Sequence, residues 1–147
     1  MAVATGKNSI TISGDSDSPY IIGPEYLKGN SPSETNMLIT GLTRRKIEVQ
    51  ISGLKSITIL NCSALTLYID GIYPSIVLDK CSGVNMSFLS KEGAEAVTII
   101  YSVCDELMFT IPGATPEDDP IETLLPEQFQ TKMVNGSIIS SILEHHG

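Results

Sequence analysis

Three cysteines, each set in the same apolar pattern, constrain the fold of this chain more than any other feature. The cysteines are Cys62, Cys81 and Cys104, so the steps between them are 19 and 23 residues. On both sides of each cysteine, apolar residues occupy alternate positions, which predicts two short strands joined by a bend at the cysteine. The apolar positions of the three copies are Ile57, Ile59, Leu65, Leu67 and Ile69, then Ile76, Leu78, Val84, Met86 and Phe88, then Ile99, Tyr101, Leu107, Phe109 and Ile111.

A bend that returns about every 20 residues is typical of a solenoid with one turn of the chain per repeat. We therefore expect an all-β fold, a parallel β-helix of five to six coils over residues 9–112. Equivalent residues of such coils stack about 4.8 Å apart, so the cysteines would form an inward core ladder. The competing interpretation is an antiparallel sandwich, which needs a hairpin turn every 8–12 residues. The hairpin-type dipeptide Asp70-Gly71 keeps that alternative open.

Composition limits the class of protein and its partners. The 147 residues support one domain, residues 1–147, and the net charge of −8 argues against nucleic acid as a partner. No apolar run reaches the length of a bilayer span, and residues 1–9 lack the apolar core of a signal peptide. We therefore expect a cytoplasmic protein with no membrane partner and no cofactor.

The odd number of cysteines favours buried free thiols over a disulfide framework. A disulfide between neighbouring coils remains geometrically conceivable. A metal site is less favoured, because three stacked cysteines have no nearby fourth ligand. No candidate nucleophile has a general base paired with it in the sequence, so we expect no catalytic residues. We also expect no metal.

The segments before the first cysteine fit the repeat loosely. Residues 9–22 are expected to form an opening coil with Ile10, Ile12, Tyr20 and Ile22 inside and Asp15 at its corner. The Gly- and Pro-rich residues 23–36 predict a long loop or a distorted coil. Residues 37–51 resume the strand pattern with Arg44 at the cysteine position. Because burying an unpaired arginine is costly, we expect that coil to be offset and its arginine to reach solvent.

The segments after the second cysteine copy carry most of the acidic residues. Residues 90–96 are an insert that we expect to bulge outward as a loop, and residues 113–126 read as an exposed connector. From Glu92 to Thr131 there are nine acidic residues and no lysine or arginine. In the tail, residues 127–147, Asn135-Gly136 predicts a hairpin. That hairpin would cap the open end of its own coil stack or of a second copy.

The sequence resembles the C-terminal domain of cyclase-associated protein. The residues that carry the resemblance are 56–62, Ser-Ile-Thr-Ile-Leu-Asn-Cys, then 89–91, Leu-Ser-Lys, then Ile111-Pro112. The most specific stretch is 125–131, Leu-Pro-Glu-Gln-Phe-Gln-Thr, which is similar to a Pro-Glu-Gln-Phe signature before the tail hairpin of the family. The resemblance runs from about residue 9 to the end of the chain.

This resemblance implies a right-handed parallel β-helix and a homodimer made by exchange of the C-terminal hairpin. It also implies binding of ADP-loaded actin monomers, exchange of their nucleotide and recycling of actin during filament turnover. The chain looks like the short form found in apicomplexan parasites. Several lysines of the family are absent, with Ser52, Ser63 and Ala64 in their places. The residues expected to make the dimer are Pro126, Glu127, Gln128, Phe129, Met133, Val134, Ile138, Ile139 and Ile142.

The candidate contacts to actin are basic residues, because actin monomers are acidic. The only basic cluster is Arg44-Arg45-Lys46, and Lys80 and Lys91 are the further candidates. A solvated strand edge that discourages unwanted pairing is the plainer interpretation of the cluster. The alternative function is that of a tubulin cofactor C-like protein, which shares the β-helix and stimulates GTP hydrolysis with an arginine finger. Arg44 or Arg45 would serve in that role.

Overall fold

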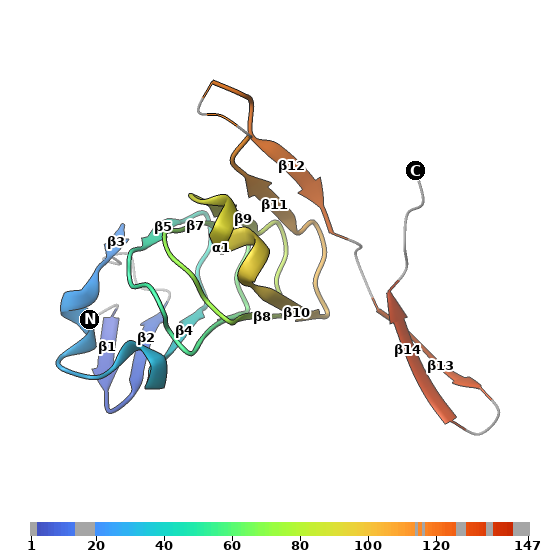
Figure 1. Ribbon diagram of the computed structural model, residues 1–147. Coiled ribbons are helices and arrows are strands. Elements are labelled where there is room, and N and C mark those ends of the chain that lie inside the picture. Colours follow the sequence, from blue (N-terminus) through green and yellow to red (C-terminus); the bar gives the residue numbers. More distant parts are fainter. Residues whose placement is uncertain are drawn as a thin grey trace.

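The computed structural model describes residues 3–13, 20–113, 115, 117–125, 129–134 and 137–142. Within these ranges the chain winds into a stack of coils with a separate hairpin at its C-terminal end (Figure 1). Each coil gives one strand to each of two sheets. The elements of the coils are β2 (Ser9–Ser13), β3 (Ile21–Ile22), β4 (Asn36–Thr40), β5 (Lys46–Val49), β6 (Ser56–Leu60), β7 (Thr66–Ile69), β8 (Ser75–Asp79), β9 (Asn85–Phe88), β10 (Thr98–Ser102) and β11 (Met108–Ile111).

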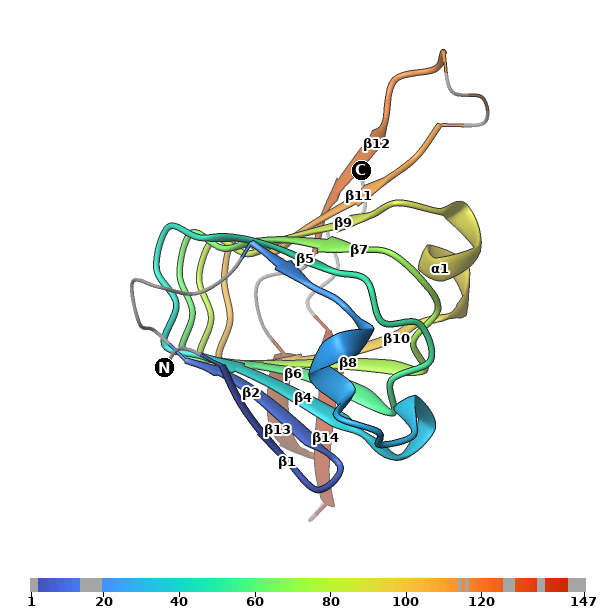
Figure 2. The ribbon, with the colours of Figure 1, turned by 90° about the vertical axis from the view of Figure 1, so that its left-hand side faces the viewer.

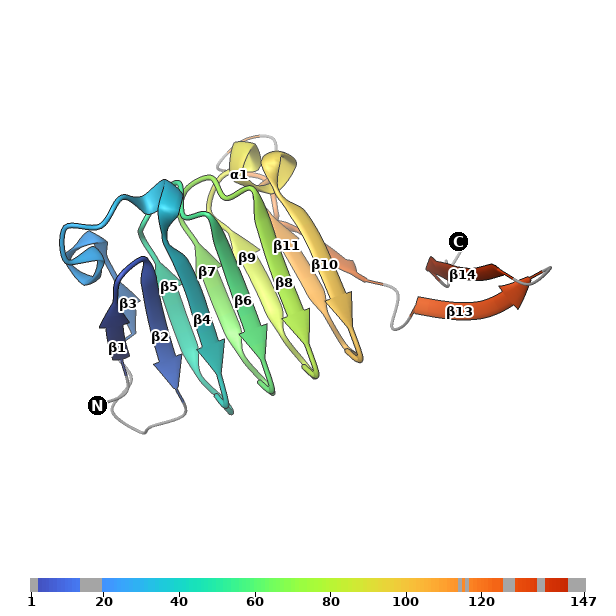
Figure 3. The ribbon, with the colours of Figure 1, turned by 90° about the horizontal axis from the view of Figure 1, so that it is seen from below.

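The strands of successive coils pair in parallel, as a β-helix requires. One sheet, sheet A, has the order β2-β4-β6-β8-β10, and the other, sheet B, has the order β11-β9-β7-β5-β3. Figure 3 shows the parallel strands of sheet A side by side. The predicted β-helix is therefore confirmed, and the antiparallel sandwich is wrong. Between β2 and β10 the described chain completes four turns, somewhat fewer than the five to six coils expected.

Two antiparallel strands extend the sheets beyond the coils. Strand β1 (Val3–Gly6) pairs with β2 at the N-terminal end of sheet A. Strand β12 (Ile121–Leu124) pairs with β11 at the C-terminal end of sheet B. The second strand lies in the segment that was predicted to be a connector leaving the stack, so that prediction is wrong for residues 121–124. All four residues of β12 are nevertheless exposed.

Register places the predicted apolar residues inside. In sheet A, Ile57 pairs with Ile76, and Ile59 pairs with Leu78, with all four side chains buried. Strand alternation then points the intervening residues outward. Each isoleucine or leucine removed from water contributes about 1.5–3 kcal/mol, so the aligned rows are the main source of stability. Sheet B supplies the facing rows, Ile47, Leu67 and Met86, and Val49, Ile69 and Phe88.

The bends between the two sheets share one backbone conformation. In the coil of Cys62, the residue before the cysteine and the second residue after it both have positive φ, 54° at Asn61 and 51° at Ala64. The left-handed conformation turns the chain sharply while the cysteine itself points inward. Equivalent pairs of positive-φ residues occur at the other bends, Gly41 and Arg44, Lys80 and Gly83, and Val103 and Glu106.

The coil of residues 37–51 is in register with the next coil, contrary to expectation. Met37 pairs with Ile57, and Ile39 pairs with Ile59. The bend residue that stacks below Cys62 is therefore Leu42, which is fully buried. Arg44 lies two residues further along, in a left-handed conformation, and is exposed. The prediction that Arg44 takes the cysteine position is wrong, whereas the prediction that it reaches solvent is confirmed.

The opening coil forms, with one exception to its predicted interior. Ile10, Ile12 and Ile22 are buried, but Tyr20 is 48% exposed and lies beside Tyr68, with ring centroids 6.4 Å apart. The predicted corner residue Asp15 lies outside the described residues. The long loop that follows contains two 3₁₀ helices, η1 (Pro24–Leu27) and η2 (Pro32–Glu34).

The insert after β9 is a helix, α1 (Lys91–Ala96), and not the loop that was predicted. Ser90 caps it, since its Oγ accepts a hydrogen bond of 3.0 Å from the backbone N–H of Gly93. Figure 2 shows that α1 and the cysteine bends lie on opposite sides of the stack. The predicted tail hairpin is present as β13 (Phe129–Val134) and β14 (Ser137–Ile142), paired in antiparallel register.

Candidate binding surfaces

The thiol ladder occupies the interior of the bends. Cys62, Cys81 and Cys104 are free and buried, with exposures of 2%, 2% and 6%. The Sγ of Cys81 donates to the carbonyl oxygens of Ile59 and Asp79, each at 3.3 Å. Burial raises the pKa of Cys81 to about 11, and it raises the pKa of the other two thiols as well. A protonated, enclosed thiol is a poor nucleophile, so the ladder is a packing feature of the core.

No group of three or more histidine, cysteine, aspartate or glutamate side chains suitable for a metal ion occurs among the described residues. The Sγ of Cys62 donates to the carbonyl oxygen of Leu60, and the Sγ of Cys104 donates to the carbonyl oxygen of Ser102. His145 and His146 fall outside the described residues. The described surface has three candidate binding faces.

The first face includes the predicted basic cluster, which the fold divides. Arg44 is exposed at a bend, and Lys46 is exposed at the start of β5. Arg45 is half-buried, because it takes the inward position that Leu65, Val84 and Leu107 hold in the later coils. Two of the three basic side chains are thus available to a partner, and Arg45 is partly enclosed by the coil itself.

The structure places the two other candidate lysines, Lys80 and Lys91, on different sides of the stack. Lys80 is exposed at a bend of the same side as Arg44, in the coil of Cys81, with a φ of 55°. Lys91 lies at the start of α1, on the opposite side of the stack (Figure 2). There its ammonium group forms an ion pair of 3.8 Å with Glu95. The predicted contacts therefore do not form one patch: Arg44, Lys46 and Lys80 share one side, and Lys91 lies apart.

The second face is the outer surface of sheet A, which sequence reasoning did not single out. Alternation makes every second residue of its five parallel strands point outward. Among these outward residues of β2, β4, β6, β8 and β10, Asp79 is the only charged one. The central row crosses the strands at equivalent positions and is β-branched or apolar: Thr11, Leu38, Thr58, Val77 and Ile100. An almost uncharged sheet face with Leu38, Val77 and Ile100 in its central row is a candidate contact surface.

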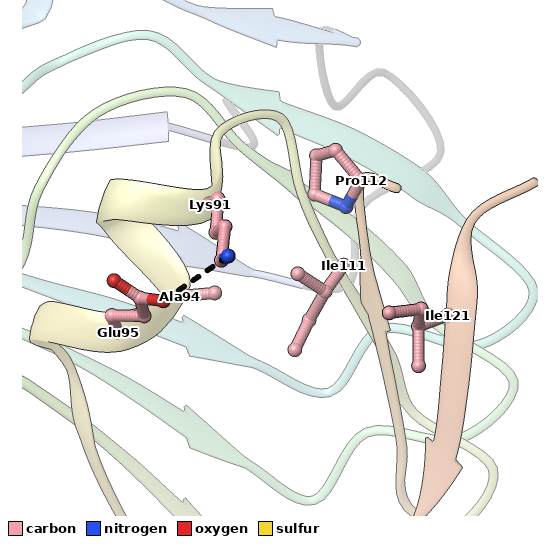
Figure 4. Close-up of a pocket in the computed structure, with 6 residues that line it drawn as sticks. All are labelled: Lys91, Ala94, Glu95, Ile111, Pro112 and Ile121. Atoms are coloured by element: carbon pink, nitrogen blue, oxygen red, sulfur yellow. Dashed lines mark ion pairs between the residues drawn. The ribbon is translucent and has the colours of Figure 1, made fainter. Parts of the chain in front are cut away.

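The third face is a pocket of about 230 Å³ between α1 and the β11–β12 ribbon (Figure 4). Lys91, Ala94 and Glu95 line it from the helix, and Ile111, Pro112 and Ile121 line it from the ribbon. Its lining comes from three separate segments, so no single stretch of the sequence marks it. The Ser90 cap and the i,i+4 pair Lys91–Glu95 were the available signals that the insert is helical.

The residues expected to make a dimer lie in the tail. Pro126, Glu127 and Gln128 fall outside the described residues. Phe129, Met133 and Val134 are in β13, and Ile138, Ile139 and Ile142 are in β14. In Figure 1 this hairpin stands away from the coil stack of its own chain.

Comparison with known proteins agrees with the fold and with the tail. A profile of the family described as "Adenylate cyclase associated (CAP) C terminal" matches residues 39–145, which is more than half of the chain. The chain belongs to the cyclase-associated protein family. The match includes the coils from the last residues of β4 onward, the ribbon and the described hairpin.

Individual members of the family show how the similarity is distributed. The adenylyl cyclase-associated protein of Dictyostelium discoideum is 33% identical over 94 residues, 64% of this chain and 20% of that protein. Cyclase-associated protein 1 of Arabidopsis thaliana is 30% identical over 90 residues, 60% of this chain and 18% of that protein. The chain thus spans about a fifth of the length of these curated relatives.

A solved structure extends the agreement to almost the whole chain. The crystal structure of cyclase-associated protein from Cryptosporidium parvum is similar with a TM-score of 0.71 and 25% identity. The superposition covers 95% of this chain and 93% of that one. Within the described ranges, no helix is both long enough and apolar enough to cross a bilayer.

Proposed function

We propose that this chain binds monomeric actin, preferably in its ADP-bound form, and promotes exchange of the nucleotide during filament turnover. The observation that carries the proposal is membership of the cyclase-associated protein family, since the resemblance to that family implies actin-monomer binding. On this proposal the chain works by binding, without a covalent step. We expect it to do so in the cytoplasm.

The actin-binding surface is proposed to be the outer face of sheet A together with the adjacent bends. The face is nearly uncharged. Lys80 is exposed at its border, directly after β8, whereas Arg44 is exposed at the other corner of the bend, two residues before β5. Uncharged area supplies the contact, whereas the border cations orient an acidic partner as it approaches. Lys46 belongs to the neighbouring sheet B, and the bends on this side also carry the exposed acidic residues Asp105 and Glu106.

The proposed active form is a homodimer that exchanges its tail hairpins. In the described part of the chain, β10 is the last strand of sheet A and β12 is the last strand of sheet B. Open strand edges of this kind invite pairing with another chain. The hairpin of β13 and β14 lies away from its own stack (Figure 1), which suits an element that covers the end of a second copy.

The exchange activity can be tested by release of a fluorescent nucleotide from ADP-actin. A partner shifts actin toward an open nucleotide cleft only if it binds that state better, so the wild-type protein should accelerate release in a saturable manner. Arg44→Glu should require more protein for the same effect, whereas Lys28→Glu, the same charge change at an exposed left-handed residue after η1, should not. No acceleration at saturating protein would refute the exchange role.

The tubulin cofactor C-like alternative makes a different prediction. An arginine finger raises GTP hydrolysis by about 10³–10⁵-fold. Arg44 is the exposed arginine that could serve, but the match to the cyclase-associated family supports the actin interpretation. Stimulated GTP turnover by tubulin or a small GTPase, lost in Arg44→Ala, would favour the alternative instead.

A further inference from the structure

The pocket between α1 and the β11–β12 ribbon has the properties of a preformed site. Helix α1 is held close to the coil, since a Cβ at Gly93 would lie 2.5 Å from the carbonyl oxygen of Gly71. The Ser90 cap fixes the first turn of the helix. On the other wall, Ile111 and Ile121 are paired across the ribbon and therefore point to the same side. Backbone packing and strand pairing thus fix α1 and the ribbon, the two elements that carry the lining residues.

The size and exposure of the pocket indicate what it can hold. Its volume of about 230 Å³ is below the roughly 300–1,000 Å³ of sites that enclose small molecules. It therefore suits one or two apolar side chains of a larger partner. Ile121 is 57% exposed, so a substantial apolar area on this wall remains open to water. Figure 4 shows Ile111 and Ile121 facing the helix across the opening.

The pocket lining holds one charge of each sign, the paired Lys91 and Glu95, and the charged residues beside it are acidic. Gly113, next to the lining residue Pro112, lies against Asp118 and Asp119: a Cβ built there would be 2.6 Å from the Cβ of Asp118 and 2.9 Å from the carbonyl oxygen of Asp119. Glu95 is part of the lining, and its partner Lys91 is the last basic residue before residue 132. A partner that carries cations beside its apolar side chain would be attracted to this rim.

We propose that this pocket is a docking site for a segment of a partner protein that combines apolar and basic side chains. An apolar side chain enters between α1 and Ile121, and flanking lysines or arginines lie beside Glu95, Asp118 and Asp119. This site is on the helix side of the stack, away from the cysteine bends. It is independent of the actin-binding face proposed above, so either proposal can fail without the other.

The test uses the full chain and a short fluorescent peptide that alternates lysine and leucine. Binding is followed by fluorescence anisotropy, and amide shifts in NMR spectra locate the peptide. We expect shifts at Ala94, Ile111 and Ile121, and about tenfold weaker binding to Ile121→Ser, from loss of a buried apolar contact. Ile21→Ser, a change of the same kind at a 45% exposed site at the other end of the stack, should bind like wild type.

The peptide controls separate apolar docking from simple charge attraction. Replacing the leucines of the peptide by serine should abolish the NMR shifts at the pocket residues, and replacing its lysines by glutamate should weaken binding. In the protein, Glu95→Gln should also weaken binding, whereas Glu34→Gln should not. Equal binding of the serine peptide, or equal affinity of Ile121→Ser, would overturn the proposal. Light scattering is the last control: if Ile121→Ser alone converted a dimer to monomers, the occupant would be a second copy, and the proposal would again be wrong.

Discussion

Gly93 of α1 lies directly against the carbonyl oxygen of Gly71, close enough that a Cβ at Gly93 would be only 2.5 Å from that oxygen. This approach joins the inserted helix to the coil below it. Alanine favours a helix over glycine by about 1 kcal/mol, but here its methyl group would meet backbone that has no room to move.

Gly93→Ala should therefore destabilise the protein despite its better helix propensity. We expect a loss of about 1–3 kcal/mol in the free energy of unfolding, typical of overpacking, measured by urea denaturation. Ala96→Gly is the matched control, since that site is exposed at the end of the helix and should cost no more than about 1 kcal/mol. Equal or greater stability of Gly93→Ala would show that α1 is not seated on the coil in this way.

Val103 is the least favourable residue at any of the bends. It has a φ of 54° and is 78% exposed, so its side chain is strained and gains little from burial. The equivalent residue in the first cysteine coil is Asn61, which tolerates this conformation better. Val103→Asn should raise the free energy of unfolding by about 1 kcal/mol, whereas Val103→Ile, which keeps the β-branch, should change it little. A destabilised Val103→Asn would contradict the left-handed bend.

The buried thiols predict how stability depends on pH. Burial raises the pKa of Cys81 from 9.0 to about 11 in the folded protein. Below pH 9 the thiol is protonated in the folded protein and in the unfolded chain, so its full stabilising effect is present. Between pH 9 and 11 only the unfolded chain releases the proton, so stability falls as pH rises, by up to about 1.4 kcal/mol per pH unit.

The measurement compares urea unfolding of wild type and Cys81→Ala from pH 7 to 11. Both lose stability at high pH because other groups titrate there, but the variant should lose less between pH 9 and 11. Parallel pH profiles would contradict the buried thiol. Rapid reaction of all three native cysteines with a thiol reagent at pH 8 would do so as well.

Removal of the tail should expose the C-terminal end of the stack. A chain that lacks residues 126–147 leaves the edges of β10 and β12 without the hairpin that we propose to cover them in a dimer. We expect monomers that aggregate, because unpaired strand edges template further pairing. Static light scattering can follow both properties. A truncated protein that remains a well-behaved dimer would refute the exchanged hairpin.

The sequence predicted most of the interior of the fold. Alternation around Cys62, Cys81 and Cys104 placed the bends and the inward strand faces correctly, because both depend on local pattern. The predicted register of the preceding coil, residues 37–51, is wrong. Leu42 is an ordinary apolar residue, and only the 20-residue step to Cys62 identifies it as the bend residue. The pattern alone instead predicts Arg44 at the cysteine position.

The surfaces were predicted less well, because they depend on contacts between distant segments. β12 pairs with β11 although acidic residues and prolines precede it, since the edge of sheet B offers a partner strand. The pocket joins residues 91–95 to Ile111 and Ile121, which no local pattern relates. The almost uncharged outer face of sheet A appears only when the five strands are aligned, because each strand alone carries ordinary serines and threonines.

The mass in solution of this protein mixed with monomeric ADP-actin tests the proposed function most directly. Size-exclusion chromatography with multi-angle light scattering would measure it, with each protein alone as reference. We predict one complex with the mass of two copies of this chain and two actin monomers. Separate elution of actin and of this protein, each with its own mass at concentrations of tens of micromolar, would contradict the assignment.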